Sequence, residues 1–211
     1  MKVENKLNDT TEGISWSVLR LALPGQSESG DRYYVKAFDD RVLVAAIDGL
    51  GHGNEAAIAG KRAIQVLDEH AMRTDSLMTL VKHCHEDLKD TRGAVMNIAS
   101  FNWNKHTMSW IGIGNVNGLY FHREKGDIHP TQVTIIQRSG IVGFKLPVLQ
   151  VTMLPVQFGD TLIFTTDGIR NNYVDDLYLQ GSTKQIAEFI AKGYAKNNDD
   201  ALILVARYLR E

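Results

Sequence analysis

VLVAAIDGLGHG, residues 42–53, joins an apolar run to an acidic turn that contains three glycines. The run from Val42 to Ile47 is short, rich in β-branched residues and almost wholly hydrophobic, which predicts a strand buried on both faces. Asp48 follows directly, and from Asn54, the expected N-cap, apolar residues recur at helical spacing. A carboxylate between a strand and a helix is well placed to bind a metal. Asp-Gly is also a common turn signal, so this stretch alone leaves both interpretations open.

Length and charge define the broad class of protein. The chain has 211 residues, and we expect residues 1–211 to form a single domain with a sizeable core. Hydrophobic residues make up 44% and charged residues 23%, which is ordinary for a soluble globular protein. The formal net charge of −2 gives no reason to expect a nucleic-acid surface.

Cysteine use and the absence of apolar segments indicate the compartment. Cys84 is the only cysteine, which rules out an intramolecular disulfide and a multi-cysteine zinc site. A half-buried thiol on a helix is favoured there over a reactive one. The first residues contain no apolar signal region, and no run of 18 apolar residues occurs. We therefore expect a cytoplasmic protein without a membrane partner.

The order of predicted elements is strands, two helices and more strands, which suits an α+β fold. We expect residues 1–13 to be a loose polar lead-in. The predicted strands are 14–23, 33–38, 42–47, 94–103, 108–113, 118–122, 133–136, 151–156, 161–166 and 201–205, and the predicted helices are 54–72, 75–90 and 183–195.

Acidic residues recur at the predicted strand ends. Asp31 precedes the second strand, and a hairpin brings it to the same sheet edge as Asp48 if the register is suitable. The strand 161–166 runs into Asp167-Gly168, which repeats the pattern at Asp48-Gly49, and Asp199 precedes the last strand. Such carboxylates suit Mg²⁺ or Mn²⁺, and a dimetal hydrolase is one hypothesis that their spacing allows without deciding it.

Other kinds of site are less well supported. No nucleophile triad, Walker A spacing or nucleophile elbow is present. His83, His85 and Glu86 are close in sequence, but His83 and His85 face apart on a helix. A solvated helix face is therefore favoured over a metal site at these histidines.

The acidic residues at the predicted strand ends lie in four stretches: Ser29-Gly30-Asp31, Ala46-Ile47-Asp48-Gly49-Leu50-Gly51, Phe164-Thr165-Thr166-Asp167-Gly168 and Asp199-Asp200-Ala201-Leu202-Ile203. In this order they resemble the motifs of the PPM/PP2C family of metal-dependent protein serine/threonine phosphatases. Arg92-Gly93-Ala94 and Gly112-Ile113-Gly114-Asn115-Val116 are weaker matches between them. The resemblance covers about residues 14–207, and the Asp-Gly-x-Gly form is most similar to the bacterial SpoIIE-like branch.

The resemblance implies a four-layer α-β-β-α sandwich of two antiparallel sheets flanked by helices. It also implies two Mn²⁺ or Mg²⁺ ions as cofactors. Asp48 would bridge both ions, the Gly49 carbonyl and Asp31 would bind one, and Asp167 and Asp199 would hold the other. Asp200 would lie beside Asp199, and an activated water would attack phosphorus without a phosphoenzyme.

The sequence departs from the family pattern at three places. Asn115 stands where many members have an aspartate linked to a third metal. No counterpart of the phosphate-gripping arginine of the eukaryotic enzymes is evident. His52 lies near the position of the general-acid histidine but is displaced along the turn, so it is a candidate acid against the alternative of a surface histidine.

The resemblance implies a phosphatase acting on phosphorylated STAS-domain proteins of a stressosome, which would reset a bacterial stress signal. One alternative is a phosphatase for an anti-sigma antagonist in another partner-switching pathway. A second is a weakly catalytic module that binds phosphorylated STAS proteins. The four metal-type aspartates favour an enzyme, because a simple binding module has no need of them.

Overall fold

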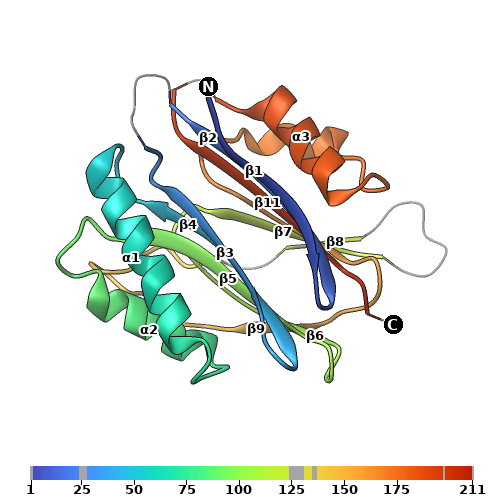
Figure 1. Cartoon of the computed structure of the whole chain (residues 1–211), viewed down its shortest axis with the longest axis horizontal. Coiled ribbons are helices and arrows are strands. Elements are labelled where there is room, and N and C mark those ends of the chain that lie inside the picture. Colours follow the sequence, from blue (N-terminus) through green and yellow to red (C-terminus); the bar gives the residue numbers. More distant parts are fainter. Residues whose placement is uncertain (1, 24–27, 124–130, 135–136, 197, 211) are drawn as a thin grey trace.

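The computed structural model describes residues 2–23, 28–123, 131–134, 137–196 and 198–210. It contains two antiparallel sheets and a small set of helices (Figure 1). The predicted strand 133–136 extends outside the described residues at positions 135 and 136.

The first sheet has six strands in the order β1-β2-β11-β10-β7-β8. Their bounds are Lys2–Thr11 (β1), Ile14–Ala22 (β2), Ala201–Tyr208 (β11), Thr161–Thr165 (β10), Asn117–His122 (β7) and Thr131–Thr134 (β8). Strands β10 and β11 are adjacent although residues 166–200 separate them in the chain. The end of β10 therefore lies beside the start of β11.

The second sheet has five strands in the order β3-β4-β5-β6-β9. Their bounds are Asp31–Ala37 (β3), Arg41–Gly49 (β4), Ala94–Asn102 (β5), Thr107–Ile113 (β6) and Thr152–Pro155 (β9). Strand β4 lies between β3 and β5 and is buried from Val42 to Ile47, as its apolar sequence predicts.

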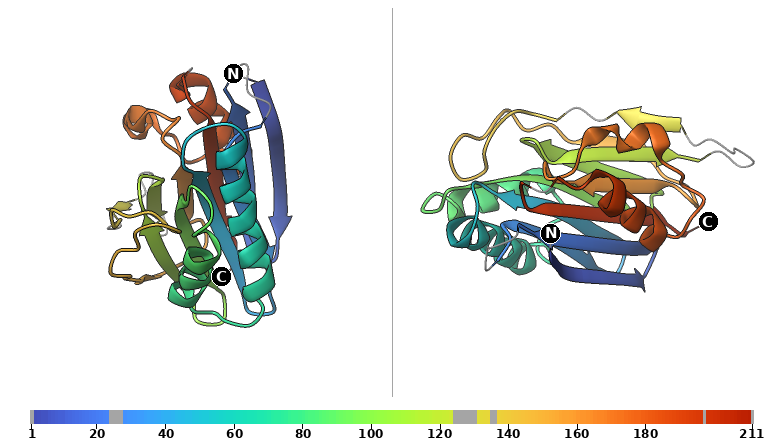
Figure 2. Two further views of the ribbon diagram at one scale, coloured as in Figure 1. Left: turned by 90° about the vertical axis from the view of Figure 1, so that its left-hand side faces the viewer. Right: turned by 90° about the horizontal axis from the view of Figure 1, so that it is seen from above.

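The helices cover the outer faces of the sheets. Helices α1 (Asn54–His70) and α2 (Leu77–Asp87) pack on the five-stranded sheet. Helix α3 (Thr183–Tyr194) and the short 3₁₀ helix η1 (Asn171–Asp176) pack on the six-stranded sheet. In the right-hand view of Figure 2, α1 and α2 lie at the left and α3 lies apart from them, toward the right.

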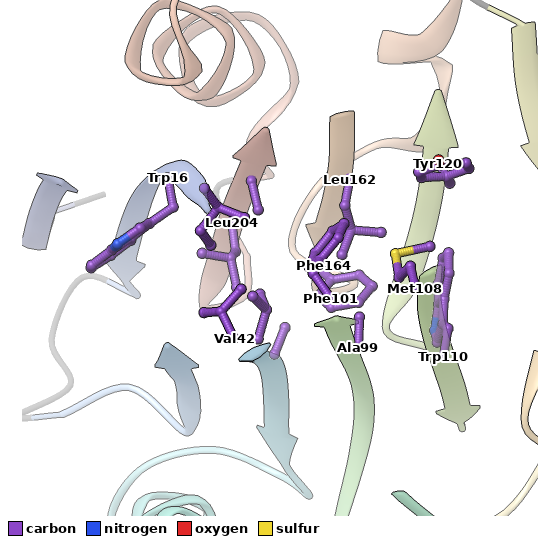
Figure 3. Packing of buried hydrophobic residues seen from close by; sticks show 14 of the residues in the cluster. Trp16, Val42, Ala99, Phe101, Met108, Trp110, Tyr120, Leu162, Phe164 and Leu204 are labelled. Atoms are coloured by element: carbon purple, nitrogen blue, oxygen red, sulfur yellow. The ribbon is translucent and has the colours of Figure 1, made fainter. Parts of the chain in front are cut away.

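The main core lies between the two sheets. Figure 3 shows Leu204, Leu162 and Tyr120 of one sheet pointing toward residues of the other, such as Val42, Phe101 and Trp110. Trp110 and Phe164 meet edge to face with ring centroids 5.2 Å apart. These layers confirm the predicted four-layer α-β-β-α sandwich.

Two local predictions were wrong. The expected lead-in of residues 1–13 is largely β1, which pairs with β2 at the edge of its sheet. Backbone hydrogen bonds build an edge strand without apolar side chains, so the polar sequence concealed it. Asn54 is the first residue of α1, and the N-cap is Gly53, which has φ 72° and no side-chain cap. Ser76 caps α2 by accepting from Thr79 N.

Candidate metal centre and active site

A cavity of about 270 Å³ opens where the acidic strand ends meet. Its lining includes five carboxylates, from Asp31, Asp48, Asp167, Asp199 and Asp200. The other lining residues are Leu23, Leu50, Gly51, His52, Asn115 and Asn198. A wider groove of about 540 Å³ lies elsewhere, at Arg20, Tyr33 and Lys61. The acidic cavity is the candidate site because of the carboxylates that line it, although it is the smaller of the two.

The β3–β4 hairpin brings Asp31 and Asp48 together as direct partners across the strand pair. Directly opposed residues of an antiparallel pair have neighbouring side chains on one face. Asp31 is buried, with 2% of its surface exposed, whereas Asp48 is half-buried. The register that the sequence left open therefore places both carboxylates at one sheet edge.

Asp31 is also bonded to the opposite sheet. Thr166, directly after β10, donates from Oγ1 to Asp31 Oδ2 at 2.8 Å. The same Oγ1 accepts from Leu202 N at 2.8 Å. Ser29 Oγ in turn accepts from Asp31 N at 3.0 Å. A buried side chain of one sheet thus fixes an acidic residue of the other.

Asp167 follows the end of β10, and Asp199 precedes the start of its antiparallel neighbour β11. Gly168 is required for the close approach of these segments, since a Cβ there would lie 1.8 Å from Asp200 O. The Asp167 side chain is exposed, and Asn115 Nδ2 donates to Asp167 Oδ2 at 2.9 Å. Asn115 therefore contacts one of the candidate ligands directly.

Asp199 and Asp200 are neighbours with different environments. Asp200 is buried, and its carboxylate accepts from Leu23 N at 2.8 Å and from Gly30 N at 2.9 Å. Asp199 is half-buried, and its Oδ1 accepts from Asp200 N at 2.9 Å. Both oxygens of Asp200 are thus used to hold the backbone on either side of residues 24–29.

The glycine-rich turn forms one rim of the cavity. Gly49 packs tightly against α1, since a Cβ at this residue would lie 2.1 Å from Ala56 O. Gly49 is not itself among the residues that line the cavity, but its neighbours Asp48 and Leu50 are. His52 is exposed and lines the cavity. Gly51 has φ 89°, and the Arg92 side chain, which pairs with Glu55, lies against it. Arg92 thus brings positive charge close to the rim.

Crowding of the carboxylates changes their ionisation. Burial, followed by the charge of Asp48, raises the pKa of Asp31 well above its usual range, and the Thr166 hydrogen bond opposes this. Burial and the charges of Asp167, Asp199 and Asp200 raise the pKa of Asp48 to about 8. Burial and Asp167 likewise raise the pKa of Asp199. This crowding of negative charge favours a bound cation.

The donor set fits a hard divalent cation. Carboxylates supply the oxygen ligands that Mg²⁺ and Mn²⁺ prefer. Within the described parts of the chain, no group of three or more His, Cys, Asp or Glu side chains forms a ready metal cage. An open cavity nevertheless suits Mg²⁺, because this ion keeps several water ligands and is held by few protein ligands.

The remaining sequence candidates lie away from the cavity lining. Cys84 is fully buried rather than half-buried, and burial raises the pKa of its thiol to about 12. His83 stacks on His70 with ring centroids 3.9 Å apart, and His85 Nδ1 accepts from Gly143 N at 3.0 Å. These contacts give His83 and His85 separate structural roles.

Sequence reasoning did not assign a role to Thr166 or to the amide of Asn115. A polar hydroxyl directly before Asp167-Gly168, at the end of an apolar strand, was the available signal for Thr166. The Asp31 contact spans 135 residues and could not be inferred from local spacing.

Residues 39–209 match the sequence family described as Stage II sporulation protein E (SpoIIE). The chain belongs to the SpoIIE family. The match includes Asp48, Asp167 and Asp199, while Asp31 precedes it. The family predicted from the motifs is therefore confirmed.

Relatives of this SpoIIE-family chain agree with that assignment. It is 22% identical to phosphoserine phosphatase RsbX of Bacillus subtilis (strain 168), over 93% of this chain and 96% of that protein. A crystal structure of RsbX in complex with magnesium superimposes with a TM-score of 0.85 at 20% identity, over 97% of this chain and 100% of that one.

Two further solved structures share the fold. One has a TM-score of 0.82 at 25% identity, over 93% of this chain and 100% of that one. It is described under the words "The bacterial stressosome: a modular system that has been adapted to control secondary messenger signaling". The catalytic domain of serine threonine protein phosphatase PstP with two manganese ions has a TM-score of 0.65 at 14% identity, over 93% of this chain and 99% of that one. The PP2C-type fold predicted from the motifs is thus confirmed.

In the described residues, none of the helices combines the length and apolar character needed to cross a bilayer.

Proposed function

We propose that this chain is a cytoplasmic, metal-dependent protein serine/threonine phosphatase whose catalytic domain spans residues 1–211. The observation that carries the proposal is the meeting of aspartates from both sheets in one cavity. Phosphoryl transfer requires a concentrated positive field, which this acidic lining provides only through bound cations. Membership of the SpoIIE family and similarity to RsbX support the same reaction.

We assign two Mn²⁺ or Mg²⁺ ions to Asp31, Asp48, Asp167, Asp199 and the Gly49 carbonyl. When bound, such ions supply positive charge to a phosphoryl group and activate water for its attack on phosphorus. Asp48 would help to hold both ions, because it lies directly opposite Asp31 in the strand pair and lines the same cavity as Asp167 and Asp199. Asp200 is assigned a structural role, since backbone amides occupy both of its oxygens.

His52 is the candidate general acid. It lines the cavity from the turn that follows Gly51 and is open to solvent, so it can reach a leaving group above the carboxylates. Protonation of the serine or threonine oxygen as it leaves is the step that this imidazole would serve.

Phosphorylated STAS-domain proteins of a stressosome are the proposed substrates, and their dephosphorylation would reset a stress signal. The similarity to RsbX and to the stressosome-related structure supports this class. A phosphorylated anti-sigma antagonist of another partner-switching pathway is the alternative substrate. A module that only binds phosphorylated STAS proteins is disfavoured, because carboxylates crowded in this way weaken the binding of a phosphate unless cations are present.

The test is phosphate release from a phosphorylated STAS-domain protein, with Mn²⁺ or with EDTA, for the wild type and Asp48→Asn. We expect release that requires Mn²⁺ and is lost in the variant. Hydrolysis of a small aryl phosphate, without action on the STAS protein, would keep the chemistry and overturn the substrate. Binding of the phosphoprotein without hydrolysis of either compound would identify a docking module instead.

A further inference from the structure

We propose that Thr166 is a positioning residue, which sets the Asp31 carboxylate for metal binding from the opposite sheet. This inference rests on the proposed function, because it assigns Asp31 to a metal. It adds a residue outside the carboxylate set, and it makes metal affinity depend on the contact between the two sheets.

The hydrogen bonds fix the direction of the Thr166 hydroxyl. Its oxygen accepts from Leu202 N at 2.8 Å, so its single hydrogen is free to point at Asp31 Oδ2, also 2.8 Å away. The backbone adds a further tie, since Thr166 N donates to Leu202 O at 3.1 Å. Thr166 is only 1% exposed, so water does not compete readily for these bonds. The hydroxyl is therefore held as a donor to one defined carboxylate oxygen.

Asp31 gains a fixed orientation from this contact. With Oδ2 engaged by Thr166, rotation of the carboxylate is restricted, and Oδ1 is the oxygen that we assign to a metal in the cavity that Asp31 lines. The backbone of Asp31 is held separately, through Ser29 Oγ. Hydrogen bonds of this kind to metal-binding side chains commonly change metal affinity by 10–100-fold.

The adjacent Thr165 is a matched control. It is as deeply buried as Thr166, at 0% exposed, and it differs in the face that it occupies. Strand alternation places it with Ile163, which packs under α3, whereas Thr166 follows Leu162 and Phe164 toward the space between the sheets. Thr165→Val removes the buried hydroxyl of the neighbouring residue, the last of β10, without removing the bond to Asp31.

The experiment is calorimetric titration of the metal-free full chain with Mn²⁺, for the wild type and for Thr166→Val, Thr166→Ser and Thr165→Val. We expect Thr166→Val to weaken Mn²⁺ binding by about 10- to 100-fold. Thr166→Ser keeps the hydroxyl and should bind within about threefold of the wild type. Thr165→Val should bind as the wild type does. Melting curves in EDTA establish that each variant is folded.

Three outcomes would overturn the inference. Thr166→Val could bind Mn²⁺ as tightly as the wild type, or Thr165→Val or Thr166→Ser could lose as much Mn²⁺ affinity as Thr166→Val does. If Thr166→Val does not fold, Thr166→Ala removes the same hydroxyl with less bulk and carries the comparison. A double-mutant cycle adds a second test. When Asp31 is already replaced by Asn, Thr166→Val should cause no further loss of Mn²⁺ affinity. Failure of the wild type itself to bind Mn²⁺ would instead overturn the proposed function, and this inference with it.

Discussion

The two halves of the acidic cavity differ in how firmly their carboxylates are held. In the five-stranded sheet, Asp31 is buried, lies directly opposite Asp48 and is bonded to Thr166. In the six-stranded sheet, Asp167 is exposed and bonded to the exposed Asn115. The first half is preorganised by strand register and burial, whereas Asp167 in the second has an exposed side chain with more freedom to adapt. A site built in this way can combine a fixed metal position with a more adjustable one.

The largest expected effect tests whether both halves are needed. Asp31→Asn and Asp167→Asn should each lower metal-dependent phosphate release by on the order of 100-fold, because each removes a charged ligand from the site. Steady-state assays over a range of Mn²⁺ concentrations measure this effect. Near-normal hydrolysis by Asp167→Asn at saturating Mn²⁺ would mean that the exposed half is dispensable.

The same two variants should differ in stability without metal. Burial and the charge of Asp48 make ionisation of the Asp31 carboxyl costly, which is why its pKa is raised. Asp31→Asn removes this cost, so it should stabilise the metal-free protein by on the order of 1 kcal/mol, or about 2–4 °C in Tm. Asp167→Asn should leave Tm almost unchanged, because its side chain is exposed. Thermal melts in EDTA provide the comparison. An equal change in Tm for both variants would show that the two halves do not differ in how their carboxylates affect stability.

Asp199 and Asp200 allow a sharper comparison within the second half. Asp200→Asn leaves only one accepting oxygen for Leu23 N and Gly30 N, so it should cost about 1–3 kcal/mol of stability. Asp199→Asn should keep the wild-type Tm in EDTA and weaken Mn²⁺ binding. Melting and Mn²⁺ titration of both variants separate the two roles. A Tm loss in Asp199→Asn as large as that in Asp200→Asn would show that both residues are structural.

The smallest expected effect concerns Asn115. Its bond to Asp167 is exposed, and such a bond contributes about 0.5–1.5 kcal/mol. Asn115→Ala should therefore weaken Mn²⁺ binding by about 2- to 10-fold, which is less than the effect expected for Thr166→Val. Asn198→Ala, which removes another amide from the cavity lining, serves as the control. If Asn115→Ala weakened Mn²⁺ binding more than Thr166→Val does, the contact in the exposed half would matter more for metal binding than the contact in the buried half. That result would contradict the proposed difference between the two halves.

The strands nearest the site were predicted well, because their apolar runs are strong signals. Predicted strand 42–47 is the buried centre of β4, and 161–166 matches β10 to within one residue. Strand β1 was missed, since an edge strand is held by backbone bonds that leave no apolar pattern. The helix after Gly53 was predicted, but its cap was placed one residue late because Gly53 provides no capping side chain.

The sequence by itself determined the family and the aspartates at the strand ends, since each motif is a local run of residues within one strand and its turn. Only the tertiary structure decided that Asp31 and Asp48 share a register, and that backbone amides bind both carboxylate oxygens of Asp200 but only Oδ1 of Asp199. It alone joined Thr166 to Asp31. Those contacts arise from strand pairing and from the packing of one sheet on the other, which bring together residues that are far apart in the chain.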